Sequence, residues 1–180
     1  MMDFNIKMKF NLNEVNYNNR LYNKNEFQKA IEEFLSHKQI HLGELFDNEY
    51  TFRDFDVVDL VNSSHKINDV VINDDNSVNV IGETLPTREG NYLKSLIKQN
   101  KVFIIPRGIG EIELNENKQE IVKNYKLLTF DFVTENVFNK NDEEVKFDET
   151  PLNALDKIIT NDFNELLNNE NVSDKQTTNT

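Results

Sequence analysis

The sequence predicts a single β-rich α+β domain followed by a C-terminal extension. Several segments alternate apolar and polar residues, which is typical of strands with one buried face. Two other segments place apolar residues three and four positions apart, which is typical of helices packed against a sheet. At 180 residues and 21.1 kDa, the chain is long enough for one ordinary hydrophobic core.

The first predicted elements are a strand and a helix. Residues Phe4 to Leu12 alternate apolar and polar side chains, so we expect one strand with a buried face. From Asn25 to about His37 the apolar spacing is helical, and Asn23 or Asn25 is available as the N-cap. The apolar positions of this helix are Phe27, Ala30, Ile31, Phe34 and Leu35.

A β-hairpin and a second helix are predicted next. Residues 70–72 and 78–81 are apolar and flank the turn-forming run Asn73 to Ser77. A short helix is then expected over residues 89–98. Its expected buried residues are Tyr92, Leu93, Leu96 and Ile97.

Two more apolar segments, residues 102–105 and 109–114, are joined by Pro106-Arg107-Gly108. Proline removes a hydrogen-bond donor and glycine frees the backbone, so we expect a bent junction between two strands. A further strand is expected over residues 126–133, after the polar turn Asn115 to Gln119.

Composition divides the rest of the chain. Residues 1–134 form the predicted domain, and residues 135–150 are an acidic linker or loop. A helix is predicted over residues 151–168, with Thr150 as its cap and Pro151 at its first position. Its apolar stripe contains Leu155, Ile158, Ile159, Phe163, Leu166 and Leu167. The stripe is a candidate partner-binding surface, and the alternative is that it covers the domain's own sheet. We expect residues 169–180 to be a disordered tail.

The charge and composition exclude several classes of function. With 20 basic and 32 acidic residues the net charge is −12, which would repel a nucleic-acid backbone but suits a partner with a basic surface. No apolar run reaches the length of a membrane helix, and the N-terminus has no signal-peptide core, so we expect an intracellular protein. The absence of cysteine removes disulfides and thiolate chemistry. We therefore expect no nucleic-acid, membrane or small-molecule partner, and no cofactor.

A set of short motifs follows in an order found in one protein family. The motifs are Asn19-Arg20-Leu21-Tyr22, Leu42-Gly43-Glu44-Leu45, Ser64-His65-Lys66-Ile67, Val80-Ile81-Gly82-Glu83, Leu85-Pro86-Thr87-Arg88-Glu89-Gly90, Arg107-Gly108-Ile109-Gly110 and Leu127-Leu128-Thr129-Phe130-Asp131-Phe132-Val133. Over roughly residues 15–135 the chain resembles the prohead maturation proteases of T4-type tailed bacteriophages, which share a fold with the herpesvirus assembly proteases.

The resemblance implies two catalytic positions, and this chain departs from the family at both. The family histidine lies in Gly-Glu-Leu-Asn/Asp-His-Pro, where this chain has Asp47. The family nucleophile is the first serine of Ser-Ser-Arg-Gly, where this chain has Ile105. Isoleucine supplies no nucleophilic oxygen. Arg107, Gly108 and Gly110 match a turn whose amides form the oxyanion hole in the family.

Replacement catalytic groups are few. The histidines are His37, His41 and His65. Adjacent strand residues point to opposite faces, so Ser64 and His65 are expected to be poorly placed for each other. A pairing of His65 with Ser95 or Thr129 stays open.

We also weighed metal and phosphate sites. Asp54, Asp56 and Asp59 suggest solvated acidic turns, and the calcium-loop-like run from Asn73 to Glu83 has Val78 where a glycine is needed. We expect no metal site. The Gly108-Ile109-Gly110 sequence also lacks the third glycine or lysine of a phosphate-binding loop.

The resulting hypothesis is a catalytically inactive prohead-protease-like protein that serves as a structural component of a tailed-phage virion. It would bind capsid or other head proteins, as a capsid-associated or decoration protein, after assembly in the host bacterial cytoplasm. One alternative is an active prohead maturation serine protease with a non-standard active site. Another is a regulatory module or shell chaperone that is absent from the virion.

Overall fold

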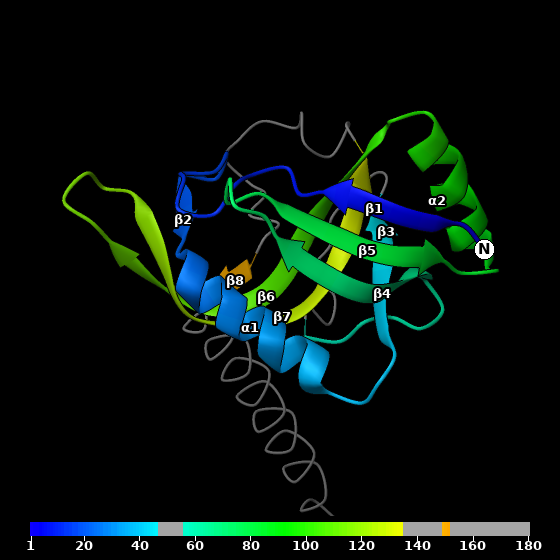
Figure 1. Ribbon diagram of the computed structural model, residues 1–180, viewed down its shortest axis with the longest axis horizontal. Coiled ribbons are helices and arrows are strands. Elements are labelled where there is room, and N and C mark those ends of the chain that lie inside the picture. The colour runs from blue at the N-terminus through cyan, green and yellow to red at the C-terminus, as the bar shows by residue number, and fades with distance from the viewer. Residues whose placement is uncertain (47–55, 135–148, 152–180) are drawn as a thin grey trace, which may run out of the picture.

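The structure is a computed structural model that describes residues 1–46, 56–134 and 149–151 (Figure 1). In chain order the elements are β1 (Asp3–Lys7), β2 (Arg20–Tyr22), α1 (Lys24–Ser36), β3 (His41–Phe46), β4 (Ser63–Ile72), β5 (Val78–Thr84), α2 (Arg88–Lys98), β6 (Val102–Leu114), β7 (Glu120–Thr134) and β8 (Glu149–Pro151). The predicted α+β class with a dominant sheet is therefore confirmed.

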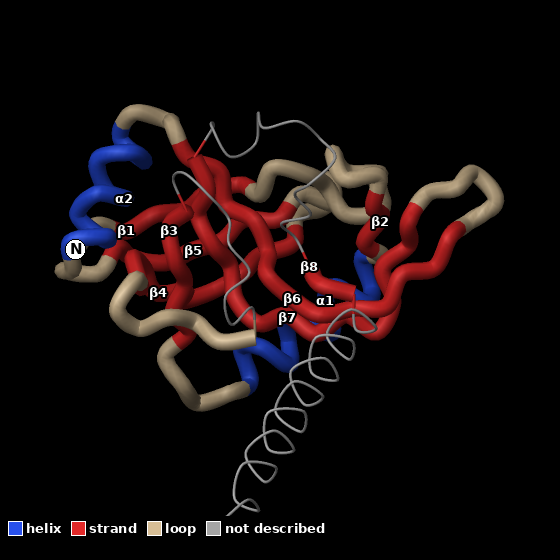
Figure 2. Tube along the Cα trace, turned by 180° about the vertical axis from the view of Figure 1, so that it is seen from behind, coloured by secondary structure: helices blue, strands red, loops and turns tan. Residues whose placement is uncertain are grey.

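The strands form one sheet in the order β1-β5-β4-β3-β7-β6-β8. Strand β2 pairs in parallel with the N-terminal end of β7, residues 120–122. Strand β3 joins two parts of this sheet, because it is antiparallel to β4 and parallel to β7. Helix α1 lies across the β7 side and α2 lies against β4 and β5 (Figure 1). From behind, β6 and β7 lie in front of α1, and the tip of their hairpin extends away from the body (Figure 2).

Apolar side chains between α1 and the sheet form the core, as the helical spacing predicts. Helix α1 buries Phe27, Ala30, Ile31 and Phe34. Its N-cap is Asn23, whose side chain accepts hydrogen bonds from the backbone amides of Asn25 and Glu26. The rest of the core includes strand residues from both parts of the sheet, such as Phe4, Val80, Ile104, Phe130 and Phe132.

Two predictions about exposure and length are wrong. Strand β1 ends at Lys7, although Met8, Phe10 and Leu12 beyond it are buried as the alternation predicts. The chain leaves the ladder there but stays attached, because the amide of Met8 donates to the carbonyl of Val78. In α2, Leu93 and Leu96 are buried, whereas Tyr92 is 47% exposed because it projects from the outer side of the helix.

The predicted junction between two strands at Pro106-Arg107-Gly108 is wrong, because β6 is one strand across this sequence. An irregularity does lie there: the pairing with β7 shifts register after Arg107 and again after Ile109, each time with one extra residue on β7. Gly108 is needed for space and not for its backbone angle: an added Cβ would lie 2.5 Å from the ring of Tyr125. The predicted polar turn Asn115 to Gln119 does connect the two strands.

The end of the described chain corrects the predicted start of the C-terminal helix. Thr150 and Pro151 belong to strand β8, which pairs in parallel with Gly108 to Gly110 of β6. An unpaired sheet edge offers backbone groups to such a segment, and sequence spacing does not reveal that. The apolar stripe from Leu155 to Leu167 lies outside the described residues. Among the described helices, none has the length and apolar character needed to cross a membrane.

Candidate functional site

A buried ionic cluster joins the three central strands. Arg107 on β6 lies with its guanidinium between Glu44 on β3 and Asp131 on β7. Arg107 Nη2 is 2.7 Å from Glu44 Oε2 and 3.0 Å from Asp131 Oδ1, and Nε is 2.8 Å from Asp131 Oδ2. The three side chains are at most 8% exposed. Two carboxylates therefore share one cation inside the sheet.

Burial dominates the electrostatics of this cluster. It raises the pKa of Asp131 from 3.8 to about 6, although the Arg107 charge and the amide of Glu44, which donates to Asp131 Oδ1, act in the opposite direction. A carboxyl group in a low-dielectric site keeps its proton to higher pH, unless nearby positive charges and hydrogen-bond donors stabilise the carboxylate enough to offset burial. The pKa of Asp131 therefore lies at about 6, above the usual range of an aspartate.

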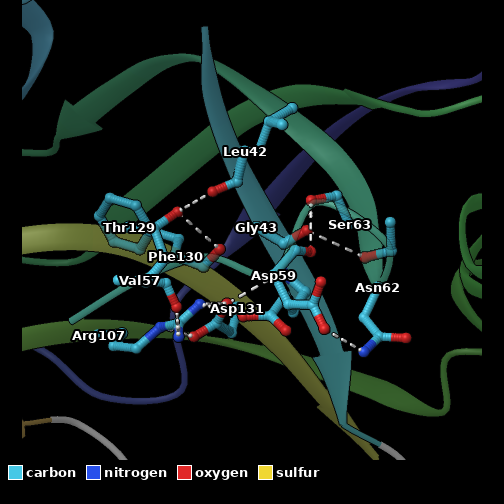
Figure 3. A network of polar contacts seen from close by, with 12 residues as sticks. Leu42, Gly43, Val57, Asp59, Asn62, Ser63, Arg107, Thr129, Phe130 and Asp131 are labelled. Atoms are coloured by element: carbon cyan, nitrogen blue, oxygen red, sulfur yellow. Dashed lines mark hydrogen bonds and ion pairs between the residues drawn. The ribbon is translucent and has the colours of Figure 1, made fainter. Parts of the chain in front are cut away.

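Arg107 also fixes the loop before β4. Its Nη1 donates to the carbonyl of Val57 at 3.2 Å, as Figure 3 shows. The same loop is closed by Asp59, which accepts from the amide of Val61 and the side chain of Asn62. The position of residues 57–62 therefore depends on the buried cluster.

A second buried polar group lies on the neighbouring strand pair. Ser64 Oγ is 2.9 Å from Nδ1 of His65, and His65 Nε2 is 3.0 Å from the carbonyl oxygen of Phe130. The prediction that Ser64 and His65 are poorly placed for each other is wrong, because the two side chains lie within hydrogen-bond distance. Between Gly43 and Glu44 the β3–β4 register shifts, which leaves Ser64 as an extra residue in a bulge. A bulge interrupts the strict alternation of side chains and turns Ser64 to the interior.

The protonation of this group follows from its partners. Burial lowers the pKa of His65 to about 3, so its ring is neutral at physiological pH. A carbonyl only accepts, so His65 Nε2 carries the hydrogen and Nδ1 accepts from the hydroxyl of Ser64. This order matches a serine activated by a histidine, but Ser64 and His65 are both 0% exposed.

The other proposed partners of His65 do not reach it. Thr129 Oγ1 donates to the carbonyl of Leu42 at 2.6 Å and lies near the Phe130 carbonyl at 3.5 Å. Ser95 is on the outer side of α2, where its hydroxyl donates to Asn91. The residue that packs against the His65 ring from β3 is a glycine, Gly43. A Cβ at this position would lie 2.1 Å from the Phe130 oxygen and 2.4 Å from His65 Nε2.

Of the two positions that the resemblance assigns to catalysis, the structure describes one, Ile105. Ile105 is 0% exposed in β6, next to the buried Ile104 and Pro106. Asp47 lies outside the described residues. Arg107, Gly108 and Gly110 lie in a strand and not in a turn, and Arg107 is occupied by the ionic cluster. Within residues 1–46 and 56–134, no group of three His, Asp or Glu side chains is placed to hold a metal.

Sequence reasoning missed the Glu44–Arg107–Asp131 cluster. A signal was present, because Glu44 and Asp131 each interrupt an otherwise apolar strand segment. Charged residues are rarely buried unless they are paired, so two acidic residues in buried strands call for a basic partner. Arg107 is the basic residue in the apolar segment between them.

The fold is similar to that of a solved protease structure. That structure is the bacteriophage T4 capsid assembly protease, gp21, with a TM-score of 0.59 and 25% sequence identity. The match covers 72% of this chain and 80% of that one. It supports the resemblance to the prohead proteases that the motifs indicate. No family model and no curated protein matches the chain.

Proposed function

We propose that this protein is a prohead-protease-like component of a tailed-phage head that does not hydrolyse peptides. The observation that carries the proposal is Ile105. It stands where the resemblance places the nucleophile, and its aliphatic side chain is fully buried in β6. Peptide hydrolysis by this family's route needs a nucleophilic oxygen at that position.

The remaining serine–histidine contact supports the same proposal. A nucleophile must reach a substrate carbonyl, and Ser64 is enclosed by β3 and by the ring of His65. The imidazole of His65 also packs edge-on against Phe4 and Phe132. These contacts make the Ser64–His65 pair a part of the core.

The proposed role is structural. The similarity to a capsid assembly protease supports a location in the phage head and partners among capsid or other head proteins. The net charge of −12 favours a partner with a basic surface. The proposed form is a capsid-associated or decoration protein.

Two measurements test this proposal. Purified protein is incubated with the capsid and scaffold proteins of the same phage, with an active capsid assembly protease as the positive control. We expect no site-specific cleavage. Mass spectrometry of purified mature particles should then find the protein at a fixed ratio to the capsid subunit, and its absence would favour a transient assembly factor or chaperone.

A second candidate is an active serine protease, and the Ser64–His65 hydrogen bond is the observation that favours it. Under this candidate, the domain opens during assembly and exposes Ser64. Cleavage that is abolished in Ser64→Ala and retained in Ser95→Ala would establish it and refute the inactive-protein proposal.

A further inference from the structure

A groove of about 510 Å³ lies between the C-terminal end of α1, the start of β3, the loop 56–60 and residues 126–128 of β7. Its rim carries Ile40, Val57 and Leu60, which are 70%, 58% and 73% exposed. The lining also includes Glu33, His37, Asp56 and Lys126, so the apolar part of the groove is this aliphatic rim. Exposed aliphatic side chains at the edge of a groove favour contact with another apolar segment.

The walls of this groove are fixed by contacts within the domain. On one side the ring of His41 packs on Phe34 of α1, with centroids 4.0 Å apart. On the other side Arg107 holds the carbonyl of Val57, and Asp59 closes the turn that carries Leu60. The groove is therefore already formed in the folded domain, and an occupant does not have to create it.

The last described residues lie close to this groove. Pro151 pairs with Gly110 of β6, and the preceding residue of β6, Ile109, pairs with Lys126 of β7 in the groove wall. Neighbouring strands are about 4.8 Å apart, so two strand spacings, about 10 Å, separate Pro151 from that wall.

The segment that follows has the length and pattern to fill the groove. Its first apolar residue of the stripe, Leu155, lies four positions beyond Pro151, which an extended chain spans in about 13 Å. The stripe continues through Ile158, Ile159, Phe163 and Leu166, at spacings that place these side chains on one face of a helix.

We propose that residues 155–166 of the same chain bind this groove through the apolar stripe. An aliphatic rim needs an apolar partner, and a tethered segment has a high effective concentration at a site within its reach. The stripe then contacts its own domain before it meets any other protein, and a head partner must compete for it. This proposal is independent of whether the protein hydrolyses peptides.

The absence of cysteine from the whole sequence makes a direct test possible. Leu60→Cys and Ile159→Cys are combined in the full chain, oxidised mildly and analysed on a non-reducing gel. We expect an intrachain disulfide in most molecules. The matched control combines Leu60→Cys with Asn164→Cys, which lies on the opposite face of the predicted helix, and should cross-link at least fivefold less. Equal cross-linking in both variants, or a disulfide between two chains, would overturn the proposal.

A second measurement avoids the geometry of a disulfide. An environment-sensitive dye is attached to the single cysteine of Leu60→Cys, and its emission is compared with and without the added substitutions Ile159→Asn and Phe163→Asn. We expect the added substitutions to shift the emission to longer wavelength, because they expose the dye to water. The control Asn161→Ser should leave the emission unchanged. An unchanged spectrum with both apolar residues replaced would mean that the groove is empty or occupied by something else.

Discussion

Two buried polar groups lie beside one another at the neighbouring β3 residues Gly43 and Glu44. They offset the free-energy cost of burying polar atoms in opposite ways. The group around Glu44 keeps its charges and pairs them with Arg107. The group next to Gly43 is neutral, because burial removes the charge of His65 and hydrogen bonds satisfy both ring nitrogens. A charged cluster is costly to disrupt, whereas a neutral chain of hydrogen bonds loses less when one member is removed.

Arg107→Met is expected to produce the largest effect. It leaves two carboxylates buried without their cation and removes the donor that holds Val57. We expect a loss of about 3 to 5 kcal/mol in the free energy of unfolding, measured by urea denaturation. The exposed Arg88→Met serves as control and should change stability by less than about 0.5 kcal/mol. Equal stability of both variants would show that the cluster does not hold the sheet together.

Gly43→Ala tests the close packing of the neutral group. An added methyl would lie 2.1 Å from a backbone oxygen that cannot move without shifting β7. We expect a loss of about 1 to 3 kcal/mol by urea denaturation, since overpacking forces neighbours apart.

The control for this variant is Gly110→Ala. Its nearest neighbour is the Cγ1 atom of Val122 at 3.0 Å, so we expect about 1 kcal/mol or less. A larger loss at Gly110 than at Gly43 would mean that the space around His65 is less restricted than the structure indicates.

The two groups should also respond to pH with opposite signs. For Asp131, with a native pKa of about 6, the folded state keeps a proton that the unfolded chain loses, so stability falls as pH rises from about 4 to 6. For His65, with a native pKa of about 3, the unfolded chain takes up a proton below pH 6.5, so stability falls as pH decreases. Each group contributes up to about 1.4 kcal/mol per pH unit, and the two contributions oppose each other between pH 4 and 6.

Asp131→Asn separates these contributions. Without the carboxyl, stability should fall more steeply than in the unmodified protein as pH decreases from 6 to 4, with a difference of up to about 1.4 kcal/mol per pH unit. His65→Gln should have the opposite effect and flatten or reverse the loss. Denaturation at a series of pH values measures both, and parallel curves for all three proteins would contradict the assigned pKa values.

The sequence predicts the order and type of the elements more completely than their contacts. Spacing alone locates α1, α2 and the β4–β5 hairpin, because helix and strand periods are local properties. The contact between Ser64 and His65 depends on a bulge opposite Gly43, and strand β8 depends on a free edge of β6. Both arise from pairing between distant segments, which no local pattern specifies. The cluster at Arg107 could have been predicted from the sequence, because Glu44 and Asp131 are acidic residues in apolar strands.

Ser64→Ala is expected to produce the smallest effect and compares the two groups most directly. It removes one neutral hydrogen bond and leaves Nδ1 of His65 without its donor. We expect a loss of about 1 kcal/mol, well below that of Arg107→Met, because no uncompensated charge is created. Ser95→Ala, in the exposed position on α2, should stay within about 0.5 kcal/mol. A loss at Ser64 as large as that at Arg107 would show that the neutral group carries as much of the fold as the charged one.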